Sequence, residues 1–157
     1  MKQISCTRRI QFCAGHRVYG HESKCANMHG HNYVAFFEAE AWAESLDDAL
    51  RNLDHIGRVI DFSVLKEKIG GWIDENWDHG FLFFSEDTAM RDLFVVNHEL
   101  IGPGAQKHFM MPVNPTAENM AWYLLRVQCP ALLEGTGVRV RKVTIWETEN
   151  CFAEATL

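Results

Sequence analysis

Residues 25–42 read CANMHGHNYVAFFEAEAW, and this stretch decides how the chain folds. From about His31 to Trp42 it is rich in aromatic side chains and alanine, which predicts an extended strand. Residues two apart in a strand point to the same side, so His29 and His31 present their imidazoles to one face. Gly30 between them leaves room for a close backbone approach. The stretch therefore predicts a strand that starts with a pair of metal-binding side chains.

A second strand is expected just upstream, over residues 4–14. Its even-numbered positions share one face, and the same parity ends on His16. If the two strands form an antiparallel pair, His16 supplies a third imidazole beside His29 and His31. Three imidazoles with one open position are the pattern of a catalytic zinc site, whereas structural sites close with four protein ligands. These three histidines are the candidate zinc ligands.

Cys25 leaves two kinds of zinc site open. As a fourth ligand it would close a non-catalytic structural site of one cysteine and three histidines. Left free, it is a thiol beside a cation, and a neighbouring cation lowers the pKa of a thiol below its free value of about 8.5. An HxH pattern alone does not separate these interpretations, because it is short and also occurs in polar loops.

Two helices are expected in the rest of the chain. Asp61 is a plausible N-cap, and Leu65 and Ile69 after it begin an apolar face at helical spacing. Thr116 is expected to cap the second helix, with Glu118 in its positive first turn.

The strand and helix order predicts the fold class. Residues 138–149 are expected to form a last strand. Residues 85–115 show no clear pattern apart from a loop at Gly102-Pro103-Gly104. Two strands, a helix, an irregular middle, a helix and a strand form an α+β order, and the length suits a single domain over residues 1–157.

The overall composition argues against several classes of protein. The 157 residues are 47% hydrophobic and 23% charged, which is ordinary for a globular protein and unlike a disordered one. A formal net charge of −6 argues against a broad surface for nucleic acid or acidic membranes. No stretch approaches the roughly 18 apolar residues of a membrane span. Five cysteines without a CxxC pair, and an N-terminus without the apolar core of a secretory signal, favour the cytoplasm.

Six motifs stand in one order along the chain. They are Phe12-Cys-Ala-Gly-His16-Arg17, Cys25 to Tyr33, Arg58-Val-Ile-Asp61-Phe62, Trp77-Asp78-His79, Pro115-Thr-Ala-Glu-Asn119 and Trp146-Glu147-Thr148. With these motifs the chain resembles the 6-pyruvoyl- and 6-carboxy-tetrahydropterin synthase family from Arg9 to about Glu149. The resemblance implies a tunnelling fold (T-fold), a four-stranded antiparallel sheet with two helices on one face. It also implies a homo-oligomer, with trimers paired into hexamers and active sites at subunit interfaces.

The resemblance assigns chemical roles to individual residues. The three histidines become the ligands of Zn²⁺, and Cys25 matches the catalytic base rather than a ligand. Asp78 and His79 match the Asp-His pair that works with that cysteine. The sequence departs from the family pattern at Cys13 and Gly15, which lie beside a ligand and not on it.

Four residues are expected to contact the substrate. Glu147 matches the glutamate that anchors the pterin, since a carboxylate can accept two hydrogen bonds from an aminopyrimidinone edge. Thr116, within the Pro115–Asn119 motif, is placed at the same site. Arg17 and Lys24 lie close in sequence to the metal and cysteine motifs and are candidates for the phosphates, or else solvated surface charges.

The function implied by the resemblance is that of a lyase acting on 7,8-dihydroneopterin triphosphate. A 6-carboxy-tetrahydropterin synthase releases acetaldehyde and triphosphate on the route to 7-deazaguanines such as queuosine. A 6-pyruvoyl-tetrahydropterin synthase eliminates triphosphate on the route to biopterin. The spacing of three residues between Cys25 and His29 resembles the bacterial carboxy-forming branch, so that branch is expected and the other stays open.

Overall fold

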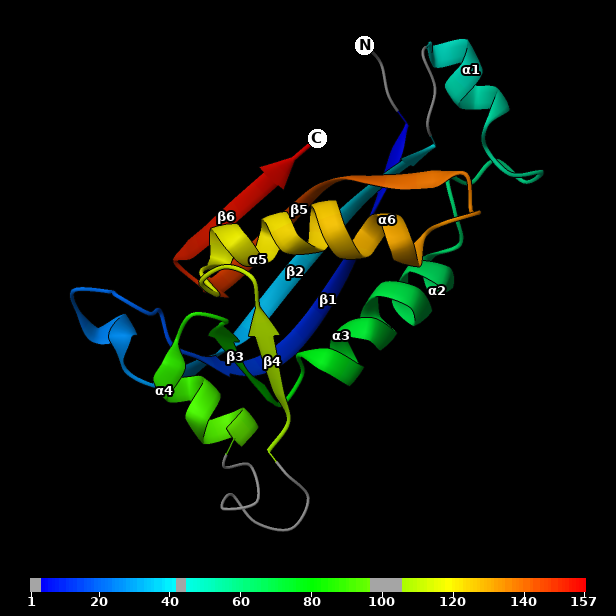
Figure 1. Ribbon diagram of the computed structural model, residues 1–157. Coiled ribbons are helices and arrows are strands. Elements are labelled where there is room, and N and C mark those ends of the chain that lie inside the picture. The colour runs from blue at the N-terminus through cyan, green and yellow to red at the C-terminus, as the bar shows by residue number, and fades with distance from the viewer. Residues whose placement is uncertain (1–3, 42–44, 97–105) are drawn as a thin grey trace.

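The computed structural model describes residues 4–41, 45–96 and 106–157. They form a six-stranded sheet in the order β4-β3-β1-β2-β5-β6, and the longer helical segments cross one face of it (Figure 1). The strands are β1 (Ser5–His16), β2 (His29–Ala41), β3 (Gly80–Phe84), β4 (His108–Met111), β5 (Val138–Thr148) and β6 (Cys151–Thr156).

Several short helices join end to end into longer segments. The α-helices are α1 (Leu46–Arg51), α2 (Phe62–Leu65), α3 (Gly71–Asn76), α4 (Thr88–Arg91), α5 (Ala117–Tyr123) and α6 (Cys129–Leu132). Wider π-helical turns connect them at η2 (Lys66–Gly70) and η5 (Leu124–Gln128), and η3 (Asp92–Val96) follows α4; η1 (Lys24–Ala26) is a single 3₁₀ turn. Residues 62–76 and 117–132 are therefore two continuous helical segments, at the places where the sequence predicts helices.

The two predicted helix caps are present. The Asp61 carboxylate accepts a hydrogen bond from the Ser63 amide at 2.8 Å. The Thr116 hydroxyl accepts one from the Asn119 amide at 3.3 Å. Each bond satisfies one of the amides that the first turn of a helix leaves unpaired, which explains why the helices begin there.

The predicted antiparallel sheet is present as four of the six strands. β1 pairs with β2, β2 with β5, and β5 with β6, all antiparallel. The strand count differs from the expectation, because β3 pairs with β1 in parallel and β4 pairs with β3 in parallel. The physical reason is that helices connect these strands: the segment of residues 62–76 carries the chain back along the sheet before β3, and α4 and η3 lie between β3 and β4. β3 and β4 span only five and four residues, too few for a strand period to stand out.

The hydrophobic core lies between the sheet and the two long helical segments. Alternate residues of β1 are buried, as the period-two pattern predicts: Ile10, Phe12, Ala14 and His16. From the helices come Leu65, Ile69, Ile73, Ala121, Leu124 and Leu125, each at most 1% exposed. This packing leaves His16 as a buried polar residue at the end of an apolar row, which fixes the site described next.

Some expectations fall outside the described residues. The loop at Gly102-Pro103-Gly104 and the predicted end of the second strand at Trp42 are among them. None of the helices in the described part of the chain combines the length and the apolar character needed to cross a bilayer.

Candidate metal centre and substrate cavity

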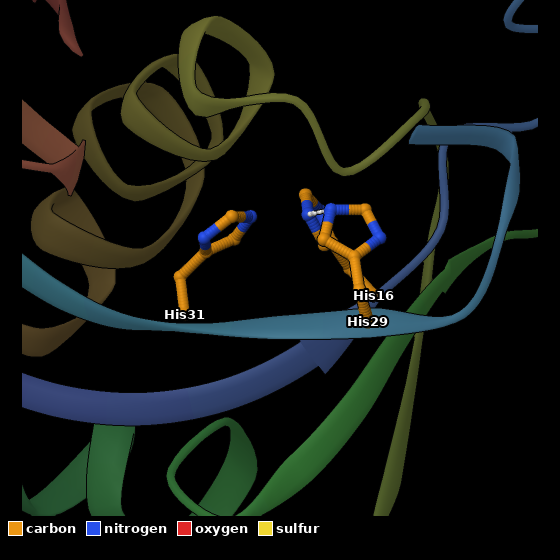
Figure 2. Close-up of side chains that lie close together, drawn as sticks. All are labelled: His16, His29 and His31. Atoms are coloured by element: carbon orange, nitrogen blue, oxygen red, sulfur yellow. Dashed lines mark hydrogen bonds between the residues drawn. The ribbon is translucent and has the colours of Figure 1, made fainter. Parts of the chain in front are cut away.

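Strand pairing brings the three histidines together. In the β1–β2 ladder His16 stands opposite His29, and His31 follows two residues along β2 on the same face. Figure 2 shows the three imidazoles turned toward one common space. The close approach predicted at Gly30 is real, because a Cβ there would lie 2.9 Å from the Ala14 carbonyl oxygen.

The ring nitrogens have the spacing of metal ligands. One ligand nitrogen from each histidine lies within 4.8 Å of the others, and the His16 and His29 Nε2 atoms are 3.0 Å apart. Tetrahedral zinc with Zn–N bonds of about 2.0–2.1 Å separates neighbouring nitrogens by about 3.3 Å. The cluster is therefore already close to the geometry that a zinc ion requires.

Backbone carbonyls hold two of the rings in the metal-binding tautomer. His16 Nδ1 lies 2.7 Å from the Pro115 oxygen, and His29 Nδ1 lies 2.7 Å from the Asn27 oxygen. A carbonyl oxygen only accepts, so each Nδ1 carries the hydrogen and each Nε2 presents a lone pair. Two lone pairs 3.0 Å apart repel unless a cation or a proton lies between them. The donor set therefore fits a metal ion.

His31 adds a buried nitrogen without a hydrogen-bond partner. Its Nε2 lies 3.3 Å from the Glu147 Oε1 oxygen, but the angles do not make a hydrogen bond and the atom is unsatisfied. A buried polar atom left unpaired costs about 1–3 kcal/mol, so a ligand is expected at this nitrogen.

Burial favours the neutral forms of His16 and His31, and a histidine must be neutral to bind a metal. Burial lowers the pKa of His16 to about 4, the neighbouring His29 and His31 add to that shift, and the Pro115 carbonyl opposes it. Burial also lowers the pKa of His31, against an opposing effect of Glu147. At neutral pH both rings are therefore ready to bind a cation.

A cavity of about 330 Å³ opens beside the histidines. Four of the residues predicted from the sequence line it: His16, Cys25, Thr116 and Glu147. The remaining walls are Val18, His21, Ala117, Glu118, Cys151, Phe152 and Ala153. The structure thus brings together, in one cavity, a candidate metal ligand and the residues predicted as base and as pterin anchor.

His79, of the predicted Asp78–His79 pair, lies at a different cavity. His79 lines a space of about 470 Å³ together with Cys13 and Gly15. The Cys13 side chain points to the opposite face of β1 from the His16 side chain, and none of the described residues lines both cavities. The His79 side chain is 79% exposed. One chain therefore does not bring His79 and Cys25 into the same cavity.

Arg17 has a partner that the sequence does not indicate. Its guanidinium donates to both carboxylate oxygens of Asp87, at 2.5 and 2.8 Å, and Asp87 is fully buried. Asp87 also caps α4 by accepting from the Met90 amide at 3.3 Å. Lys24 is exposed within η1 and is not among the cavity walls. Of the two candidates for the phosphates, Arg17 is thus engaged in a structural ion pair.

Two cavity walls have no role in the sequence-based prediction. His21 lies in the loop between β1 and η1, where its Nδ1 accepts from the Ser23 amide at 2.9 Å. Cys151 begins β6. The loop after β1 brings His21 to the site, and the β5–β6 turn brings Cys151. Neither residue belongs to a recognisable sequence motif, so no signal along the chain pointed to them.

Comparison with known proteins gives one consistent family. A family described as 6-pyruvoyl tetrahydropterin synthase matches residues 5–156 of the chain. A relative from Rickettsia bellii named 6-carboxy-5,6,7,8-tetrahydropterin synthase is 37% identical over 151 residues, which cover 96% of this chain and 99% of the relative. One of the same name from Haemophilus influenzae is 27% identical over 148 residues, with 94% and 95% covered.

Solved structures support the same fold. An uncharacterized protein from Wolinella succinogenes superposes with a TM-score of 0.76 at 21% identity, covering 99% of each chain. The 6-pyruvoyl tetrahydropterin synthase of Caenorhabditis elegans superposes with a TM-score of 0.60 at 22% identity, covering 100% of this chain and 97% of the other. At these identities the likeness establishes the T-fold and nothing finer.

Proposed function

The chain belongs to the 6-pyruvoyl tetrahydropterin synthase family, and from this premise we propose that it is a zinc-dependent 6-carboxy-5,6,7,8-tetrahydropterin synthase. The reaction takes 7,8-dihydroneopterin triphosphate and water to 6-carboxy-tetrahydropterin, acetaldehyde and triphosphate, on the route to 7-deazaguanines such as queuosine. One observation carries the proposal: three clustered imidazoles stand beside a cavity lined by a thiol and a carboxylate. The names of the full-length relatives favour this product over 6-pyruvoyl-tetrahydropterin, which is the alternative.

His16, His29 and His31 are the proposed zinc ligands. Bound there, zinc supplies a Lewis acid for the hydroxylated side chain of the substrate. The chain contributes the orientation, because the Pro115 and Asn27 carbonyls hold two of the rings with Nε2 inward. This arrangement resembles the outer-shell hydrogen bonds of known metal-bound histidines.

Cys25 is the proposed base that removes a proton from the substrate side chain. It is half-buried in the cavity wall, and its Sγ is not part of the atom cluster that lies within 4.8 Å around the three histidines. This supports a free thiol over a fourth zinc ligand. A thiolate near a cation is both available and basic enough for proton transfer near neutral pH. Because the thiol must stay reduced, the proposal includes a cytoplasmic location.

Glu147 and Thr116 are the proposed contacts to the pterin. The Glu147 carboxylate stands on β5 in the cavity wall, where it can accept hydrogen bonds from the amino and ring N–H groups of the pterin. The Thr116 hydroxyl already accepts from the Asn119 amide and keeps its own hydrogen for the ligand.

The proposed role of His79 requires more than one subunit. The His79 side chain is highly exposed and lines a different cavity from Cys25. The sheet ends in two edge strands, β4 and β6, and open edges favour pairing with another chain. We therefore include a homo-oligomer, a trimer or hexamer, in which His79 of one subunit reaches the cavity of a neighbour.

Product analysis tests the proposed function. The zinc-loaded protein is incubated with 7,8-dihydroneopterin triphosphate, and mass spectrometry is expected to detect 6-carboxy-tetrahydropterin and acetaldehyde. Formation of 6-pyruvoyl-tetrahydropterin would favour the alternative branch. An inert protein whose cobalt-substituted form shows an intense thiolate-to-metal charge-transfer band would favour the structural zinc module, in which Cys25 is a ligand.

A further inference from the structure

Lys107 sits against the turn that carries Asp78 and His79. Its Nζ donates to the backbone oxygen of Asp74 at 2.6 Å and to that of Asp78 at 2.6 Å. Asp74 lies in the last turn of α3, whose carbonyls have no partner within the helix and carry the negative end of its dipole. A lysine ammonium there satisfies two carbonyls at once and joins the end of the helix to the turn.

The turn holds His79 in a backbone conformation that needs support. Its φ of 56° lies in the left-handed region, which costs a non-glycine residue roughly 1–2 kcal/mol. Two bonds to β1 oppose that cost: the His79 amide donates to the Cys13 oxygen at 2.6 Å, and the Cys13 amide donates to Asp78 Oδ1 at 2.8 Å. The other carboxylate oxygen, Oδ2, accepts from His79 Nδ1 at 2.7 Å. Lys107 is the third support, through its bond to the Asp78 oxygen.

Lys107 belongs to the segment of residues 85–115, for which the sequence shows no clear pattern. β4 begins at the next residue, and the Phe81 amide of β3 donates to the Lys107 oxygen at 3.0 Å. The aliphatic stem then passes over Gly80, where a Cβ would lie only 3.1 Å from Lys107 Cδ. Gly80 therefore keeps open the path by which the ammonium reaches the turn.

We propose that Lys107 is a positioning residue for the Asp78–His79 pair, fixing the turn so that the His79 imidazole projects outward in one orientation. The inference rests on the proposed function, which assigns His79 its part in the reaction. The positive charge of Lys107 also favours the ionised form of Asp78. Burial raises the pKa of Asp78, but the Cys13 amide, His79 and Lys107 together lower it below its ordinary value. An ionised Asp78 keeps the hydrogen on His79 Nδ1 and leaves Nε2 free to accept a proton.

Amide hydrogen exchange at His79 tests this role without relying on turnover. Lys107→Met keeps an unbranched chain but removes the charge and the donors. Exchange of the His79 amide is expected to become at least about tenfold faster, because its bond to Cys13 then depends on a looser turn. Turnover is expected to fall about tenfold with KM changed less than twofold, since the pterin contacts are untouched. Lys107→Arg is expected to restore most of both losses.

Lys68→Met is the matched control. Lys68 is an exposed lysine of η2, in the helical segment of residues 62–76 that also contains Asp74. This variant is expected to leave exchange and turnover unchanged. Unaltered His79 exchange in Lys107→Met would overturn the proposal even if turnover fell. If Lys107→Met does not fold, Lys107→Gln is compared in the same way. Should the wild type show no lyase activity, the function fails, while the exchange data still decide the role of Lys107.

Discussion

At the scale of single residues, the imidazole of His16 shows how burial prepares a side chain for its role. It is 1% exposed, and its pKa falls from an ordinary 6.5 to about 4. In the unfolded chain His16 is mostly protonated below pH 6.5, but in the folded chain it is mostly protonated only below about pH 4. The unfolded state therefore holds more protons between these values, and stability is lost as the pH falls through this window.

We predict that the metal-free protein loses on the order of 3 kcal/mol of unfolding free energy through His16 as the pH falls from 6.5 to 4, and none through it above 6.5. Urea unfolding of chelator-treated protein across this range measures the loss. His16→Gln, which does not titrate, is expected to flatten the slope. An identical slope in the variant would assign the acid sensitivity to other groups.

Removal of either β2 ligand is predicted to abolish zinc binding. His29→Ala and His31→Ala each leave two imidazoles where three are needed, so both variants are expected to lose the metal that the wild type retains at one ion per chain. Metal analysis of the purified proteins measures this. His55→Ala, at an exposed histidine far along the sequence, is the control and should keep its zinc. Full occupancy in the ligand variants would mean that the site lies elsewhere.

Cys25→Ala is predicted to keep its zinc and lose activity. A positioned acid–base group contributes about 10²–10⁴-fold to rate, so turnover should fall by that factor while the metal content stays at the wild-type level. Parallel metal and rate measurements separate the two possible roles of the thiol. A variant that loses its metal would support the structural zinc module instead.

At the scale of secondary-structure elements, the bidentate Arg17–Asp87 pair ties the end of β1 to the start of α4. Asp87 is buried and caps α4, and Arg17 directly follows His16, a proposed metal ligand. Breaking a buried pair from one side leaves an uncompensated charge, which is more costly than replacing both partners.

Arg17→Met is therefore predicted to destabilise the protein by about 3 kcal/mol, measured by urea unfolding at neutral pH. The double variant Arg17→Met with Asp87→Asn should recover part of the loss, because asparagine carries no charge and still caps a helix. If Arg17→Met instead kept full stability and only weakened binding of the triphosphate substrate, the phosphate-binding role expected from the sequence would be correct.

At the scale of the whole molecule, the separation of His79 from Cys25 leads to a prediction about assembly. The two residues line different cavities of one subunit, so the proposed reaction needs a second subunit to bring them together. An inactive Cys25→Ala chain mixed with an inactive His79→Ala chain after mild dissociation is predicted to regain part of the activity. Sedimentation of a fully active monomer would contradict this arrangement.

The sequence by itself determined the features that depend on residues near one another. The parity of β1, the His29–His31 spacing and the caps at Asp61 and Thr116 are local patterns with a direct geometric consequence. The order of motifs added the family, and through it the four antiparallel strands and the residues to search for at the site.

Only the tertiary structure decided what depends on distant segments meeting. The parallel strands β3 and β4 follow from two separate helical connections, and no short pattern in the few residues of these strands encodes them. Arg17 pairs with Asp87, which is 70 residues away along the chain. Lys107 supports the His79 turn by bonding to Asp78, which is 29 residues away. Contacts of this kind carry no periodicity along the chain, because they depend on where packing places each segment.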